Sequence, residues 1–194
     1  GAGARIGHSL EEDAAQPVTT LDGRNIVLAA NLNNPADARY AVEAGANGVG
    51  LLRTEFLFFN RNTLPNEDEQ YEGYLEVAAS MGERPVVIRT LDLGADKKTS
   101  ILEFPPEKNP FLGYRAIRYC LRNPAVFKTQ LRALLRASAA ADNIKIMYPM
   151  ISGVEEFDAA QKVLHECMEE LKQEGKAYNP QIEVGIMIEV PSAV

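Results

Sequence analysis

Five short apolar runs, separated from one another by longer amphipathic stretches, constrain the fold of this chain more than any other feature. The runs cover residues 26–30, 49–52, 85–88, 144–148 and 184–188. Strands that are apolar on both faces and joined by helices are typical of a parallel sheet with right-handed crossovers. The pattern therefore predicts an α/β fold built from five strand–helix units.

Helix-start signals lie between the runs. Asn66 with Glu69 resembles a capping box and predicts a helix to about residue 81. Ser152 with Glu155 forms a second capping box and predicts a helix to about residue 173. Residues 110–140 are predicted to be mainly helical, because Asn-Pro steps open two helices there.

The chain divides into a short tail and one domain. Residues 1–17 are rich in Gly, Ala and acidic side chains, and they are predicted to be a linker or the tail of an upstream segment. The domain is predicted to cover residues 18–194. Five units do not settle whether the sheet is open or closes into a barrel, and a complete eightfold barrel takes about 250 residues. Because the chain ends soon after the fifth run, we expect a truncated domain.

Composition excludes several classes of protein. Twenty Lys and Arg against 27 Asp and Glu give a net charge of −7, which argues against binding to nucleic acid or to a membrane surface. No run reaches the ~20 apolar residues of a membrane span, and the start does not resemble a signal peptide, so we expect a cytoplasmic protein. The two cysteines, Cys120 and Cys167, are predicted to be reduced structural thiols.

A polar residue follows each of the first three runs, at the points where function collects in parallel α/β folds. Asn31 follows the first run, Arg53 the second and Arg89 the third. Two guanidinium groups on one rim repel each other unless an anion lies between them, and each can bind phosphate or carboxylate through two parallel hydrogen bonds. Alternatively, each Arg pairs with a nearby carboxylate, such as Glu55 or Asp92, and holds its loop. The residues alone favour neither interpretation.

Further candidate residues lie at three places in the sequence. Glu189 ends the fifth run, where a carboxylate needs a partner, and a single carboxylate is compatible with Mg²⁺. The loop of residues 92–98 contains Lys97 and lacks the P-loop pattern, so nucleotide binding gains no support. Arg115 and Arg118 share one face of a predicted helix, for which a solvated basic stripe is the plainer interpretation.

Seven stretches carry a family likeness: GANGVGLLRTEFLF (45–58), LPNEDEQ (64–70), VVIRTLDLGADK (86–97), NPFLGYRAIR (109–118), QLRALLRAS (130–138), IKIMYPMI (144–151) and GIMIEVPSA (185–193). Taken in order, they resemble the phosphoenolpyruvate (PEP)-binding domain of enzyme I of the bacterial sugar phosphotransferase system, the phosphoenolpyruvate-protein phosphotransferase family. RTLDLGADK, together with Tyr114 inside NPFLGYRAIR, points to enzyme I or to a fused multiphosphoryl transfer protein.

The resemblance implies a TIM-type (β/α)8 barrel, of which about the first five strand–helix units are present, with PEP and Mg²⁺ bound at the upper rim. By position, Arg53, Arg89 and Arg115 match the arginines that hold the phosphoryl and carboxylate groups of PEP. Glu189 matches one of the two Mg²⁺ carboxylates, and Lys97 lies in the matching loop with a less defined role.

In the family, the phosphoryl group passes from PEP to a histidine on a separate N-terminal domain, and then to a histidine phosphocarrier protein in sugar uptake. The sequence has no Gly-Gly-x-x-Ser-His segment, and neither Cys120 nor Cys167 matches the proton-donating cysteine of the family. The resemblance thus implies part of a homodimeric enzyme, with no catalytic residue of its own and inactive alone. A binding or regulatory module that keeps the arginine rim is the alternative.

Overall fold

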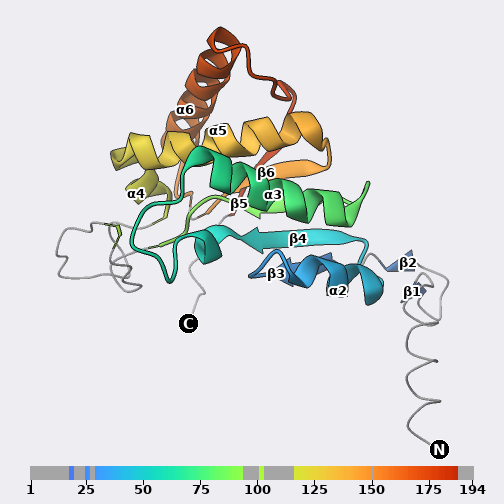
Figure 1. The fold of residues 1–194 in the computed structure, drawn as a ribbon. Coiled ribbons are helices and arrows are strands. Elements are labelled where there is room, and N and C mark those ends of the chain that lie inside the picture. Colours follow the sequence, from blue (N-terminus) through green and yellow to red (C-terminus); the bar gives the residue numbers. More distant parts are fainter. Residues whose placement is uncertain are drawn as a thin grey trace, which may run out of the picture.

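The computed structural model describes residues 18–19, 25–26, 29–93, 101–102, 116–149 and 151–187. Its central element is a sheet of five parallel strands in the order β3-β4-β5-β6-β7 (Figure 1). The strands are β3 (Ala29–Leu32), β4 (Gly48–Arg53), β5 (Val86–Arg89), β6 (Ile144–Tyr148) and β7 (Val184–Ile186). The predicted α/β fold with a parallel sheet is confirmed.

The helices cover the sheet in the order in which the chain makes them. They are α2 (Asp37–Glu43), α3 (Glu67–Met81), α4 (Ile117–Arg122), α5 (Pro124–Ala140) and α6 (Val154–Gln173), with a short 3₁₀ turn, η1 (Thr54–Leu57), after β4. Helix α3 packs between α2 and α5, and α5 packs against α6. The strands follow one another in sequence order across the sheet. In a doubly wound sheet, by contrast, the strand order reverses at one point. The described units therefore form part of the wall of a TIM-type barrel.

The first strand differs from its prediction. Parallel pairing begins where Ala29 lies opposite Gly48, whereas Asn25–Ile26 forms a separate two-residue strand, β2, paired antiparallel with β1 (Val18–Thr19). The buried side chain of β3 is Leu32, which lies beyond the predicted end at residue 30. The strand is shifted because this register places Leu32 beside Leu52 in the core.

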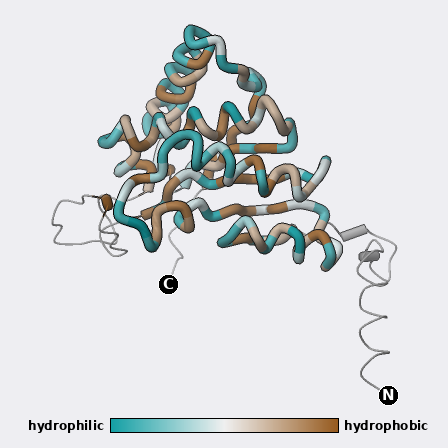
Figure 2. Tube along the Cα trace, in the orientation of Figure 1, coloured by the Kyte–Doolittle hydropathy of each residue, from teal (hydrophilic) through white to brown (hydrophobic). Residues whose placement is uncertain are grey.

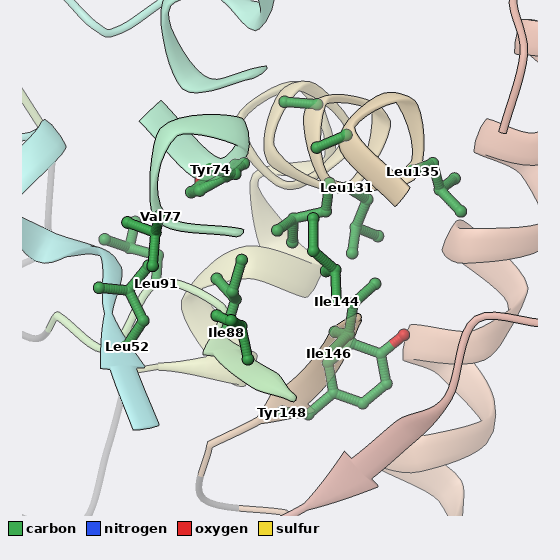
Figure 3. Packing of buried hydrophobic residues seen from close by; sticks show 14 of the residues in the cluster. Leu52, Tyr74, Val77, Ile88, Leu91, Leu131, Leu135, Ile144, Ile146 and Tyr148 are labelled. Carbon is green, nitrogen blue, oxygen red and sulfur yellow. The ribbon is translucent and has the colours of Figure 1, made fainter. Parts of the chain in front are cut away.

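The core lies between the sheet and the helices. Ile88, Ile146 and Tyr148 from the strands pack with Tyr74 and Leu131 from the helices (Figure 3). In β5 and β6, side chains on the other face of the sheet are only partly buried, so the two faces differ in burial. Figure 2 shows the matching alternation of hydrophobic and hydrophilic residues along the helices.

The two predicted capping boxes have different outcomes. Asn66 caps α3, since its Oδ1 accepts a hydrogen bond from the Glu69 N–H at 2.8 Å, as predicted. The second pairing is wrong: Ser152 contacts Glu156, whose carboxylate accepts from both the N–H and the Oγ of Ser152. The N-cap of α6 is Gly153, so the predicted partner Glu155 lies in the first turn without this contact.

Within the described ranges, no helix is long and apolar enough to cross a membrane. The predicted tail, residues 1–17, lies outside them.

Candidate functional site

The carboxyl ends of β4 and β5 bring two arginines to one rim of the sheet. Arg53 and Arg89 are the last residues of these strands and lie opposite each other in the parallel register. A pocket of about 340 Å³ opens beside them. Its lining residues are Asn33, Arg53, Glu55, Phe56, Phe59, Arg89 and Asp92.

Arg89 is buried and paired with two carboxylates. Its Nη2 lies 3.1 Å from Oε1 of Glu55, and its Nη1 lies 3.1 Å from Oδ2 of Asp92. The same Glu55 oxygen accepts a hydrogen bond from the Asp92 N–H at 2.9 Å. The loop-holding contacts predicted as one alternative are therefore present for Arg89, and its role toward an anion stays a prediction.

Arg53 is only partly buried and has a different environment. Its Nη1 donates a hydrogen bond of 3.0 Å to Oδ1 of Asn33, and no ion pair joins it to another described residue. Asn33 replaces the predicted Asn31, which lies within β3 because that strand starts and ends later than expected. Arg53 is thus the guanidinium with capacity left for a ligand.

Buried polar atoms without a partner gather at this rim. Oε2 of Glu55, Nε of Arg89 and Oγ1 of Thr90 have no hydrogen-bond partner among the described residues. Such atoms are normally completed by water or by a polar ligand, because leaving them unsatisfied costs free energy. Two of these atoms belong to Glu55 and Arg89, whose side chains line the pocket.

Sequence reasoning missed the aromatic part of this pocket. Phe56 and Phe59 belong to the segment after β4 and line the same space as the two arginines. The RTEFLFF run was available as a signal, but an apolar side chain after a strand does not distinguish a pocket wall from the core.

Several predicted site residues cannot be placed. Arg115, Lys97 and Glu189 lie outside the described residues. Arg118 lies in the first turn of α4 and contacts the first turn of α6, with its Nε 3.1 Å from Oε1 of Glu156. It therefore links two helices, while the predicted stripe with Arg115 stays a prediction because Arg115 lies outside the described residues.

Cys120 and Cys167 are both free and buried, as predicted. The pKa of each thiol is raised, with burial as the largest cause. The pKa of Cys167 is raised to about 12. Neither side chain lines the pocket at the rim.

The described residues include no group of three or more His, Cys, Asp or Glu that could hold a metal ion. The two carboxylates beside the pocket, Glu55 and Asp92, both contact the Arg89 guanidinium. As described, this rim suits an anion better than a cation.

Comparisons with known proteins agree with this geometry. A family model described as "PEP-utilising enzyme, PEP-binding domain" matches residues 8–194. The chain is 50% identical over 177 residues to the phosphoenolpyruvate-protein phosphotransferase of Bacillus subtilis (strain 168), covering 91% of this chain and 31% of that protein. It is also 50% identical over 173 residues to the Staphylococcus aureus protein of the same name, covering 89% and 30%.

The chain spans about a third of the length of the curated relatives that it matches. Among solved structures, a 2,3-dimethylmalate lyase of the PEP mutase/isocitrate lyase superfamily aligns over 93% of this chain and 79% of its own. Its TM-score of 0.34 and sequence identity of 11% are too low to bear on fold or function.

Proposed function

Because this chain belongs to the PEP-binding domain family of PEP-utilising enzymes, we propose that it supplies part of the PEP site of a phosphoenolpyruvate-protein phosphotransferase. The observation that carries the proposal is the pairing of Arg53 with Arg89 at the carboxyl ends of neighbouring strands, beside a pocket. The proposed reaction is taken from the name of these relatives. The two arginines at the rim suit its substrate, because PEP is an anion.

PEP carries a phosphate and a carboxylate on a three-carbon enol, and the pocket offers a partner for each part. Arg53 lines the pocket, and its planar guanidinium matches a phosphate or carboxylate through two hydrogen bonds. Phe56 and Phe59 provide an apolar wall for the carbon skeleton. The pocket therefore suits an anion that has one apolar edge.

Arg89 is oriented before substrate arrives. Glu55 and Asp92 fix its guanidinium plane, so an anion meets a cation that needs little rearrangement. We propose that a PEP oxygen displaces Asp92 from Nη1, while Glu55 keeps its contact with Nη2. This exchange preserves a carboxylate on one side of Arg89 and places the incoming anion between the two arginines.

In the proposed reaction, the bond between the phosphorus and the enol oxygen of PEP breaks as a histidine nitrogen bonds to phosphorus. The enolate that leaves becomes pyruvate when it is protonated. The arginines hold the phosphoryl oxygens in line and stabilise their charge, which is the main contribution a protein makes to phosphoryl transfer. In the same proposal, the histidine lies on a separate N-terminal domain and passes the group to a histidine phosphocarrier protein.

The resemblance also leads us to propose Arg115 and Lys97 as further PEP contacts, Glu189 as a ligand of Mg²⁺, a homodimer and a cytoplasmic location. Magnesium would supply positive charge to the phosphoryl oxygens. The described carboxylates at the rim do not fit this metal, since both contact Arg89, so Glu189 is the residue of this chain that would hold it.

Titration of the ¹⁵N-labelled chain with PEP, followed by NMR, tests the proposal. We expect saturable shifts of the Arg53 side-chain and Asp92 backbone signals, and much weaker responses to sulfate. Arg53→Met should raise the Kd for PEP by about tenfold or more, since a hydrogen bond to a charged group contributes roughly 1.5–3 kcal/mol.

Arg39→Met is the matched control, because Arg39 is an exposed arginine of α2 that does not line the pocket. Its Kd for PEP should equal that of the unaltered chain. No saturable response to PEP, or equal Kd values for Arg53→Met and the unaltered chain, would count against the proposal.

A further inference from the structure

A chain of hydrogen bonds among buried side chains lies behind the rim, on the helix side of the sheet. Gln130, from the middle of α5, is 1% exposed and makes three of these bonds. Its Oε1 accepts from the Leu91 N–H at 2.8 Å, and its Nε2 donates to Thr54 Oγ1 at 3.0 Å and to Tyr74 Oη at 3.1 Å. One helix residue thereby contacts both segments that carry the rim arginines.

The direction of each hydrogen bond follows from the Leu91 N–H, which can only donate. The Gln130 oxygen must face it, so the amide nitrogen faces the two hydroxyls, which accept. Thr54 then donates its own proton to the Arg89 carbonyl at 2.8 Å. Reversing the Gln130 amide would leave the Leu91 N–H facing another donor, so the network permits a single orientation.

The other end of the network is equally well defined. Tyr74 donates from its Oη to Oε1 of Gln70 at 2.8 Å, and Gln70 donates from Nε2 to the Pro65 carbonyl. Burial is the largest cause that raises the pKa of the Tyr74 hydroxyl, so this group keeps its proton at neutral pH. The network therefore extends from the loop before α3 to the backbone of Arg89.

We propose that Gln130 is a positioning residue for the PEP site: it fixes the backbone from Arg89 to Asp92 from behind, while Glu55 fixes it from the front. The inference rests on the proposed function, because it assigns Gln130 a role in holding that site. Through Leu91 and Thr54, the amide sets where the carbonyl of Arg89 and the N–H of Asp92 lie. The orientation of the Arg89 guanidinium follows from these two positions.

Stability alone does not require an amide at this place. Replacing all the members of a buried hydrogen-bonded group by apolar side chains of similar shape is often close to neutral for stability. A network with one permitted orientation instead specifies geometry, which apolar packing does less sharply. Its location at the carboxyl ends of β4 and β5 matches a need for geometry in that part of the molecule.

The test compares Gln130→Met with Asn143→Leu. Asn143 is a matched control because it is also a buried amide, whose Nδ2 lies 2.9–3.0 Å from the carbonyl oxygens of Ala78, Gly82 and Arg84. It precedes β6 and lies at the opposite end of the sheet from the rim. Urea unfolding gives the loss of stability for each variant, and amide hydrogen exchange and PEP titration report on the rim.

In Gln130→Met, exchange at the Leu91 and Asp92 amides should rise at least about tenfold more than exchange in β6, since these amides lose their local support. The Kd for PEP should rise about fivefold or more, as expected for misplacing a contact of the site. Asn143→Leu should change exchange at Leu91 and Asp92 only as much as its global stability changes, and should leave the Kd unchanged.

Two variants of Thr54 keep the test decisive if Gln130→Met fails to fold. Thr54→Ser retains the hydroxyl that joins Gln130 to the Arg89 carbonyl, whereas Thr54→Val removes it at nearly constant volume. The serine variant should keep the Kd and the exchange rates of the unaltered chain. The valine variant should reproduce the changes expected of Gln130→Met.

The outcomes separate this inference from the proposed function. Rim-specific exchange without PEP binding by the unaltered chain overturns the proposed function and leaves Gln130 only a structural role at the rim, so it overturns the positioning role for the PEP site as well. PEP binding that neither Gln130→Met nor Thr54→Val weakens overturns the positioning role and leaves the proposed function standing. Equal changes of Kd in Gln130→Met and Asn143→Leu also overturn it, since they would reflect only lost stability.

Discussion

Replacing Arg89 by methionine should destabilise the chain far more than the same change at Arg53, although both residues belong to the proposed anion site. Methionine keeps most of the aliphatic length and removes the guanidinium. At Arg89 this removes the ion pairs to Glu55 and Asp92, whose side chains are only 9% and 12% exposed. At Arg53 it removes a partly exposed hydrogen bond to Asn33.

The two environments set the magnitudes. Removing one partner of a buried ion pair costs about 3–5 kcal/mol, because the remaining charge is left without compensation. Glu55 keeps the hydrogen bond from the Asp92 N–H, which places Arg89→Met toward the lower end of that range. A partly exposed polar contact contributes about 1 kcal/mol or less, so Arg53→Met should remain close to the unaltered chain.

Urea unfolding followed by far-ultraviolet circular dichroism measures both changes, since the chain has no Trp for fluorescence. Adding Glu55→Gln to Arg89→Met should recover about 1 kcal/mol or more, because it removes the buried Glu55 charge that Arg89 no longer compensates. An Arg89→Met chain within about 1 kcal/mol of the unaltered protein would refute the reasoning, since such a small loss is typical of exposed ion pairs. So would equal losses at Arg53 and Arg89.

Two further predictions concern titratable groups away from the rim. Burial raises the pKa of the Cys120 thiol, and raises that of Cys167 to about 12, so both should react with a thiol reagent at pH 8 much more slowly in the folded chain than in urea; fast labelling of the folded chain would contradict this. Burial alone raises the pKa of Glu156, but hydrogen bonds from Ser152 and Arg118 outweigh it and lower the pKa. The stabilisation is therefore present above the unfolded pKa of about 4.3 and is lost as pH falls through the lower folded value. Glu156→Gln should lower the urea midpoint at pH 7 and reduce its further fall below pH 5, whereas parallel pH profiles of the two chains would show that this carboxylate contributes nothing.

The parallel sheet was predictable because its strands and helices have different periods in the sequence. Each apolar run was short and each intervening stretch long, which excludes a hairpin architecture. The register of Arg53 with Arg89 was also accessible, since equivalent positions after consecutive parallel strands meet at one edge. These features depend on local pattern and on topology, both of which the sequence contains.

The limits of the first strand were not predictable from apolar residues. The run at residues 26–30 is apolar in sequence, but strand pairing with β4 determines which of its residues enter the sheet. That pairing shifted the strand end and brought Asn33 to Arg53 in place of Asn31. A boundary that depends on a partner strand is not contained in the segment itself.

The state of Arg89 was open for a related reason. Both Glu55 and Asp92 were recognised as candidate partners, yet sequence distance does not determine whether a guanidinium faces them or an anion. In the structure both carboxylates contact the Arg89 guanidinium, because η1 turns Glu55 back toward the end of β5. Such three-residue arrangements depend on side-chain packing between elements, which periodicity does not describe.

Gln130 shows why the interior of a helix can conceal a residue that serves a site. Its place in QLRALLRAS lies on the buried face of α5, beside Leu131 and Leu134, where a polar residue looks like an exception to the pattern. The exception becomes intelligible only when Leu91, Thr54 and Tyr74, which are 39 to 76 residues away in sequence, meet it in space. A buried amide is expensive unless its partners are in place, so its position constrains all three segments together. Polar residues that interrupt an apolar helix face near the carboxyl ends of parallel strands are therefore candidates for holding a site, even where they touch no ligand.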